Sequence, residues 1–229
     1  MRKKIVIISF IIILSILTFS FKLFNDLKIE SNLQNELNEL TTLINNKNLQ
    51  NQEKIQEKLT TYISKNDYLI VEKAYKSYLL DIFQESLIIK DLLNDKRITT
   101  ILTPENILND IDFQESKNFL TKTKESLNTS IAKLINLLDE NKRLSYLDKD
   151  IGDYYLNFYK KISFNENFKK SKESLEKTLN TYNNIFSAYE EAINFLTENK
   201  NNYKIKDSLI YFKNKELNES YNNIISKLN

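Results

Sequence analysis

The sequence predicts an all-α protein: an N-terminal transmembrane helix followed by an extracytoplasmic antiparallel bundle of about five or six helices, with a small β-hairpin near the C-terminus. Three observations predict this class. Residues 5–21 are apolar and uncharged. Apolar side chains in most of the remaining chain recur at spacings of three and four. Residues 202–212 contain strand-like alternation. We therefore divide the chain into an anchor, residues 1–24, and one exported domain, residues 25–229.

The N-terminal segment has the features of a membrane anchor. Arg2, Lys3 and Lys4 precede 17 uncharged residues, and Lys22 follows them. As a helix this run is roughly 26 Å long, enough to span the lipid bilayer when the flanking lysines reach the interface. The basic cluster is expected to stay in the cytoplasm, which makes the chain a single-pass protein of the cell membrane with its C-terminal domain outside.

A cleaved signal peptide is the alternative interpretation of the same segment. Its cleavage site would use Thr18 and Ser20, which stand next to the bulky Phe19 and Phe21 and match a small-x-small site poorly. Cleavage would make the domain a secreted protein. Both interpretations export the rest of the chain.

The exported part shows a succession of apolar seams with helical spacing, which predicts long helices packed at shallow angles. The breaks between them, at 45–48, 95–112 and 147–162, suit chain reversals and favour a bundle over one long coiled coil. The seam residues, in chain order, are Leu33, Leu37, Leu40 and Ile44; Ile55, Leu59 and Tyr62; Val71, Tyr75, Tyr78, Ile82, Glu85, Ile89 and Leu92; Leu120, Leu127, Ile131, Leu134 and Leu138; and Leu175, Leu179, Tyr182, Phe186, Tyr189, Ile193 and Leu196.

Local signals mark two helix starts. Thr103 is an expected N-cap, because Pro104 suits the first helical position and Glu105 suits the helix dipole. Residues 163–166 read "SFNE", a capping box expected to open the longest helix.

Near the C-terminus the pattern changes from helix to hairpin and back. Tyr203 and Ile205 alternate with polar residues, Lys206-Asp207 can turn, and residues 209–212 are rich in strand formers. A closing helix follows, with Leu217, Tyr221, Ile224, Ile225 and Leu228 on one face.

The stretch 147–160, "LDKDIGDYYLNFYK", surrounds the only glycine, Gly152, with aspartates. A calcium loop of the EF-hand type needs glycine at position six and glutamate at position twelve. Counted from the first aspartate, glycine falls at position five and Tyr159 at position twelve, so we expect no metal here. The stretch instead predicts a short helix, with Asp150 as its N-cap or Asp153 in its first turn. Gly152 would give the backbone conformational freedom where the chain enters this helix.

Composition limits the chemistry of the chain. Its 229 residues include no cysteine, no histidine and a single glycine. These absences argue against disulfides, thiolate nucleophiles, the usual catalytic triads, common zinc sites and glycine-rich phosphate loops. We therefore expect no cofactor, no catalytic residues and no enzymatic activity. The 33 basic and 31 acidic residues nearly balance, so no nucleic-acid partner is expected.

Tyrosines are the candidate contact residues, because each offers an apolar face and a polar tip. The expected ligand or partner surface consists of Tyr154, Tyr155, Tyr159, Tyr203 and Tyr211. Tyrosines on the seams are expected to pack in the core instead. Glu85 interrupts a seam, either as a buried carboxylate or at the seam's edge in contact with water.

Several segments resemble a group of uncharacterised, N-terminally anchored exported proteins of low-GC Gram-positive bacteria. They are "VEKAYKSYLLD" (71–81), "ILTPENILNDIDFQESKNFL" (101–120), "DYYLNFY" (153–159) and "FLTENKNNYKIKDSLIYFKNKELNESYNNI" (195–224). The resemblance implies an extracytoplasmic helical domain on a membrane or lipid anchor, and it supplies no activity. Because this chain has no cysteine to carry a lipid, the apolar helix would be its only anchor.

These observations together predict a non-enzymatic, membrane-anchored helical protein that acts through protein–protein contacts at the cell envelope. The expected partners are the lipid bilayer, through residues 5–21, and a protein at the outer face of the membrane. The alternative is an extracytoplasmic module that binds or senses a peptide, a glycan or a cell-wall fragment and works with a partner subunit.

Overall fold

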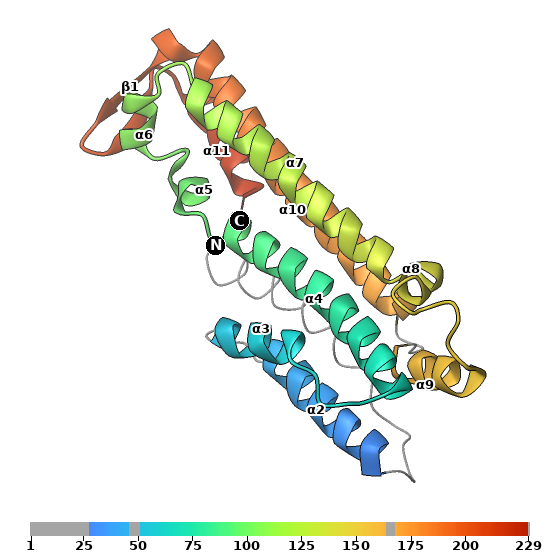
Figure 1. The fold of residues 1–229 in the computed structure, drawn as a ribbon. Helices are drawn as coiled ribbons and strands as arrows, with labels where there is room; N and C mark the ends of the chain where they lie inside the picture. Colours follow the sequence, from blue (N-terminus) through green and yellow to red (C-terminus); the bar gives the residue numbers. More distant parts are fainter. Residues whose placement is uncertain (1–27, 46–50, 164–167, 229) are drawn as a thin grey trace.

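The computed structural model describes residues 28–45, 51–163 and 168–228. These residues are mostly α-helical and form one two-stranded antiparallel hairpin near the C-terminus (Figure 1), as predicted. The elements are α2 (Lys28–Asn45), α3 (Gln52–Thr60), α4 (Asp67–Leu93), α5 (Lys96–Thr100), α6 (Pro104–Asn109), α7 (Gln114–Leu137), α8 (Glu140–Leu144), α9 (Asp153–Ser163), α10 (Phe168–Glu198), the 3₁₀ turn η2 (Lys200–Asn202), β1 (Tyr203–Lys206), β2 (Leu209–Phe212) and α11 (Lys215–Ser226).

The predicted membrane segment, residues 5–21, lies outside the described residues. Among the helices that the structure describes, none combines the length and the apolar character needed to cross a membrane.

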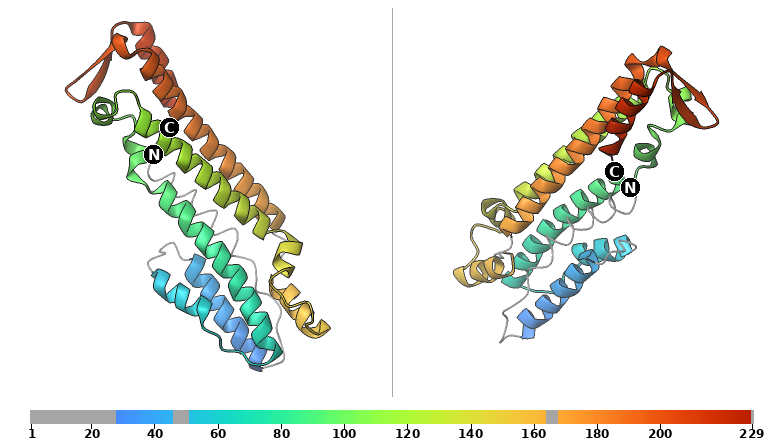
Figure 2. Two further views of the ribbon diagram at one scale, coloured as in Figure 1. Left: turned by 45° about the horizontal axis from the view of Figure 1, so that its top comes forward. Right: turned by 180° about the vertical axis from the view of Figure 1, so that it is seen from behind.

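Three long helices, α4, α7 and α10, form the body of the molecule. α7 packs against both α4 and α10 and runs antiparallel to each of them (Figures 1 and 2). The α2–α3 pair and α9 pack on α4, and α11 packs on α10. This arrangement makes an elongated molecule with the hairpin at one end and the first turns of α2, α4 and α9 at the other.

The predicted seams form the core, because burying an apolar stripe is what stabilises an amphipathic helix. Four seam tyrosines, Tyr75, Tyr78, Tyr182 and Tyr189, are at most 3% exposed, which confirms that they pack inside. The fully buried aliphatic seam residues are Leu33, Leu37, Leu40, Ile55, Val71, Ile131, Leu134, Leu175, Ile193 and Leu196.

The described residues contain more helices than the five or six expected. The short helix α5 lies in the predicted break at 95–112, and α8 lies just before the one at 147–162; helices of five residues leave no amphipathic stripe to recognise. Helix α3 ends at Thr60, so Tyr62 lies beyond it and is 44% exposed, contrary to its assignment to a seam.

The structure also differs from the prediction of a capping box that begins at Ser163. Ser163 is the last residue of α9, where it is buried and its hydroxyl donates to the carbonyl of Tyr159 at 2.7 Å. Ser163 therefore ends one helix and does not cap the next, and residues 164–167 lie outside the described residues. The other predicted cap is confirmed, since the Thr103 side chain accepts from the backbone N–H of Asn106 at the start of α6.

Candidate functional site

The hairpin that follows α10 is held by its turn and its register. Asp207 and Ser208 have φ of 51° and 57°, the paired left-handed geometry of the two-residue turn that suits the strand twist. The predicted hairpin is thus confirmed, with its turn one residue later than expected. Tyr203 pairs with Phe212, and Ile205 pairs with Ile210.

An aromatic cluster fixes the hairpin to the helices. The ring centroid of Phe212 lies 5.8 Å from that of Phe195 on α10 and 5.2 Å from that of Tyr221 on α11. Tyr203 meets Phe212 at 5.8 Å, and Phe195 stacks on Tyr221 at 6.0 Å. Because aromatic pairs at these separations are attractive beyond their buried area, the hairpin is a packed part of this end.

A groove of about 700 Å³ opens beside this hairpin. Its walls are the segment that joins α5 to α6, the first residues of β2, and α11, and Tyr189 of α10 also lines it. No lining residue is charged, and most of the accessible lining is apolar. The volume lies within the range of small-molecule sites, which is about 300–1,000 Å³.

Large apolar side chains are exposed around the same end of the molecule. Leu209 of the hairpin is 56% exposed, and Tyr211 is 43% exposed. Leu108 and Ile111, at 58% and 53%, follow the start of α6, which Figure 1 places beside the hairpin. A concentration of exposed apolar side chains around a groove is typical of an interaction site.

The floor and rim of the groove differ in polarity. Tyr221 is buried in the floor, and burial together with the neighbouring Tyr203 raises the pKa of its phenol to about 12. Asn218 and Asn222 stand one helical turn apart on α11, line the groove and are exposed. Within the described residues neither side-chain amide has a hydrogen-bond partner. The groove therefore combines a neutral apolar floor with two free amides.

The predicted tyrosines divide between the two ends of the molecule. Tyr203 and Tyr211 belong to the hairpin, with Tyr203 packed on Phe212 and Tyr211 exposed. Tyr154, Tyr155 and Tyr159 belong to α9 at the opposite end. The structure therefore does not bring the five residues together on one surface.

The α9 tyrosines make internal contacts. Tyr154 is 55% exposed, and its hydroxyl donates to the buried carboxylate of Glu30, which also accepts from Tyr68 at 2.8 Å. That hydrogen bond raises the pKa of Tyr154, whereas burial is the main cause of the raised pKa of Tyr68. Tyr155 meets Tyr68 edge to face at 5.0 Å.

Tyr159 lies in the core. Its side chain has no exposed area, and its hydroxyl donates to the carbonyl of Arg143 at 2.7 Å. Burial raises the pKa of this phenol, so it remains a neutral donor. In this structure Tyr159 contributes to packing and not to the molecular surface.

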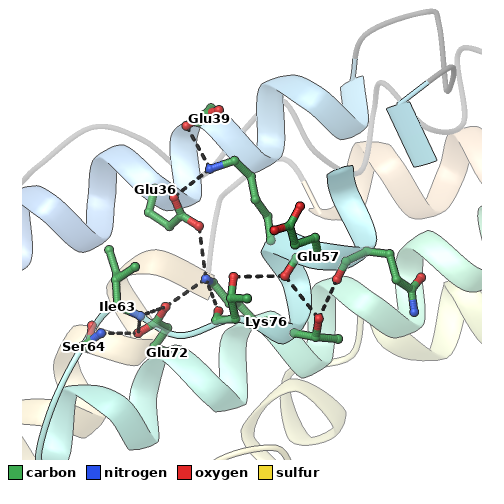
Figure 3. Close-up of polar contacts among 11 residues, drawn as sticks. Glu36, Glu39, Glu57, Ile63, Ser64, Glu72 and Lys76 are labelled. Carbon is green, nitrogen blue, oxygen red and sulfur yellow. Dashed lines mark hydrogen bonds and ion pairs between the residues drawn. The ribbon is translucent and has the colours of Figure 1, made fainter. Parts of the chain in front are cut away.

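A cluster of charges lies between α2, α3 and α4 (Figure 3). Lys76 and Glu72 are fully buried, and the lysine Nζ lies 2.8 Å from the carboxylate. Lys76 also contacts Glu36 at 3.3 Å and donates to the carbonyl of Thr61 at 2.8 Å. Lys58 joins Glu36 to Glu39 at 3.0 Å each.

The same carboxylate of Glu72 accepts from the backbone N–H groups of Ile63 and Ser64 (Figure 3). Burial alone would raise the pKa of Glu72, but the bonds from Lys76 and the two N–H groups outweigh burial and lower it. Because each buried charge already has its partners, this cluster holds the helices together and offers no free group to a ligand.

Glu85 is held by an ion pair across two helices. Its side chain is 12% exposed, and one carboxylate oxygen lies 2.7 Å from Lys133 Nζ on α7. Its other oxygen is buried without a hydrogen-bond partner. Glu85 thus lies between the two alternatives expected from sequence, mostly buried and paired with an exposed lysine.

Within the described ranges, no three carboxylates, histidines or cysteines gather in a group that could hold a metal ion. The stretch 147–160 contains the start of α9, as predicted, with Asp153 in its first turn. The carbonyl of Gly152, and no group of Asp150, accepts the first helical hydrogen bonds at 3.0 Å. Gly152 itself has no positive φ, so the expected need for its flexibility is not found.

Sequence analysis did not identify the groove as a site, because its walls come from segments more than 100 residues apart. The usable signal was the recurrence of asparagine at 214, 218 and 222, which places amides on one face of α11. Comparison with protein-family models, curated proteins and solved structures finds no match for this chain. Its function is therefore argued from the groove alone.

Proposed function

We propose that this chain is a non-enzymatic protein, anchored in the cell membrane through residues 5–21, that binds a partner protein at the outer face of the membrane. The hairpin end is its contact surface. The observation that carries this proposal is the uncharged groove beside β2, with the exposed Leu209 in its lining and the exposed Tyr211 and Leu108 on the neighbouring β2 and α6. Such surfaces are stabilised when a partner covers them.

The position of the groove suits a tethered protein. The described chain begins at α2, where Glu30 contacts Tyr68 at the start of α4 and Tyr154 at the start of α9. The groove instead follows the C-terminal end of α10, whose 31 residues are about 46 Å long. A membrane segment that precedes α2 would therefore hold one end of the molecule and present the groove at the other. Tethering raises the local concentration of the groove toward partners in the same membrane.

Photo-cross-linking in intact cells tests this proposal. A photoreactive phenylalanine analogue is placed at Tyr211, which is 43% exposed, or at Tyr62, which is 44% exposed and lies between α3 and α4. We expect a defined protein to cross-link from position 211 and not from position 62. Equal products from both positions, or no product from 211, would contradict the proposal.

The second candidate function is an extracytoplasmic module that binds a small ligand, such as a glycan or cell-wall fragment, and signals through a partner subunit. The groove volume of about 700 Å³ favours this alternative. A ligand that binds only the folded protein must raise its melting temperature. A melting screen of the purified full-length chain that shows no shift with wall fragments or glycans would remove this candidate.

A further inference from the structure

We propose that the groove beside β2 binds an extended, uncharged peptide segment of the partner through its backbone. The side-chain amides of Asn218 and Asn222 pair with the peptide N–H and C=O groups, and the peptide's apolar side chains lie against Tyr221 and Ile225. This inference rests on the proposed function and names the chemistry of the partner.

The spacing of the two amides matches an extended peptide. Asn218 and Asn222 are four residues apart on α11, which separates them by about 6 Å along the helix axis. Alternate residues of an extended strand are about 6.4–6.8 Å apart and direct their N–H and C=O groups to the same edge. A primary amide provides one acceptor and two donors, so each asparagine can pair with both groups of one peptide residue.

The two asparagines are available for this role. Both are exposed, and neither side chain has a hydrogen-bond partner among the described residues. The next asparagine toward the N-terminus of α11, Asn214, is occupied, because its side chain accepts from the backbone N–H of Leu217 at 2.9 Å as the N-cap of the helix. Asn218 and Asn222 are therefore unoccupied asparagines of α11 that line the groove, whereas the exposed Asn223 lies outside it.

The opposite wall supplies a strand edge. Lys213 N–H donates to the carbonyl of Asn202 at 2.8 Å, which makes these two a hydrogen-bonded pair. Because such pairs alternate along an antiparallel ladder, Ile205 and Ile210 form a non-hydrogen-bonded pair, and the backbone groups of Ile210 point away from β1. Ile210 lines the groove. An extended peptide can thus meet polar backbone partners on both walls.

The charge of the lining selects the side chains of the peptide. The groove has no charged residue, so a charged side chain placed there would lose water without gaining a partner. Tyr221, with its pKa raised to about 12, also stays neutral. Apolar side chains lose no hydrogen bonds to water when they enter the groove, and they cover the exposed part of its floor. The complementary ligand is an apolar peptide in extended conformation.

Fluorescence anisotropy tests this inference on the full-length chain in lipid nanodiscs, with empty nanodiscs as the blank. The probes are end-blocked nonapeptides in which leucine, valine or phenylalanine alternates with threonine. A matched set carries N-methyl groups at alternate residues, which removes the N–H groups of one edge and keeps every side chain. We expect saturable binding of the unmethylated peptides and at least tenfold weaker binding when the edge facing α11 is methylated.

The protein variants are Asn218→Ala with Asn222→Ala, and Asn223→Ala as the matched control. All three asparagines are exposed on α11, and alanine favours helix, so the substitutions preserve the helix. Asn223 does not line the groove. We expect each lost amide to weaken binding about tenfold and Asn223→Ala to bind as the parent does. Absence of binding by every unmethylated peptide, or equal affinities for the parent and the double variant, would overturn the inference.

The cellular cross-link separates this inference from the proposed function. If a partner cross-links to position 211 with the same yield in the Asn218→Ala/Asn222→Ala chain, the backbone mode is wrong and the function remains. Position 211 could instead yield no product, or cross-link only to residues 1–27 of the same chain or to a second copy. Each of these results would contradict the proposed function, because no separate partner protein would then contact the groove.

Discussion

At the scale of single residues, the ion pair of Lys76 and Glu72 is buried and depends on its neighbours for stability. Both side chains are fully buried, and removing charges from water is costly unless their attraction and hydrogen bonds compensate. Here Glu72 receives two backbone N–H groups, and Lys76 has Glu36 and Thr61 as further partners. The pair therefore fixes the segment between α3 and α4 against two helices.

Glu72→Gln is expected to lower the free energy of unfolding by about 3–5 kcal/mol at pH 7, because it leaves the charge of Lys76 buried without its nearest partner. Urea denaturation of the full-length chain measures the change. Glu53→Gln, on the exposed face of α3, is the control and should change stability by less than about 0.5 kcal/mol. Equal effects of the two substitutions would contradict the importance of the pair.

The same carboxylate predicts a pH dependence. The pKa of Glu72 is lowered from its ordinary value of 4.5, so its contribution is complete above that value and is lost as the pH falls through the folded-state pKa. The difference in unfolding free energy between the parent and Glu72→Gln should therefore shrink from pH 6 toward pH 3. A difference that stays constant over this interval would show that Glu72 is not charged and stabilised in the folded protein.

Gly152→Ala should be tolerated although Gly152 is the only glycine. Its φ is not positive, and an added Cβ would meet only the Tyr155 ring, at 4.0 Å. Alanine restricts the unfolded chain but is less favourable than glycine at the N-cap position that Gly152 occupies, so we expect stability to change by less than about 1 kcal/mol, measured by urea denaturation. A loss of more than 1 kcal/mol would mean that this turn needs the freedom of glycine.

At the scale of elements, the hairpin turn stores backbone strain that can be relieved. Ser208 has φ of 57°, a region that glycine occupies without the steric cost paid by other residues. Ser208→Gly is expected to raise the free energy of unfolding by about 0.5 kcal/mol. Ser220→Gly, at an exposed position inside α11, is a control with the opposite expected sign. It should lower the free energy of unfolding by roughly the same amount. Thermal unfolding followed by circular dichroism distinguishes the two signs.

Long elements were predictable from sequence because their burial pattern repeats many times. The seam from Leu175 to Leu196 persists over six turns, and the structure buries it in α10. Short elements were not predictable, since a five-residue helix such as α8 shows less than two turns of any pattern. The sequence from Ser163 had the residue types of a capping box, but in the structure α9 continues through that serine.

At the scale of the whole molecule, the account depends on what lies at each end. The sequence indicated hairpin tyrosines and α9 tyrosines as one candidate surface, yet folding separates them along the length of α10. It gave no indication that residues near position 102 meet α11, because such long-range contacts leave no local pattern. The groove that results is the single feature from which a contact function follows.

The most direct test of this account is the yield of the position-211 cross-link when the groove is blocked. Ile225→Arg places a charge in the uncharged groove, and Asn223→Arg places the same charge on a part of α11 outside it. With folding of both variants verified by circular dichroism, the account predicts that Ile225→Arg abolishes the cross-linked partner and that Asn223→Arg retains it. Retention of the partner by both variants would contradict the claim that the groove is where this protein binds.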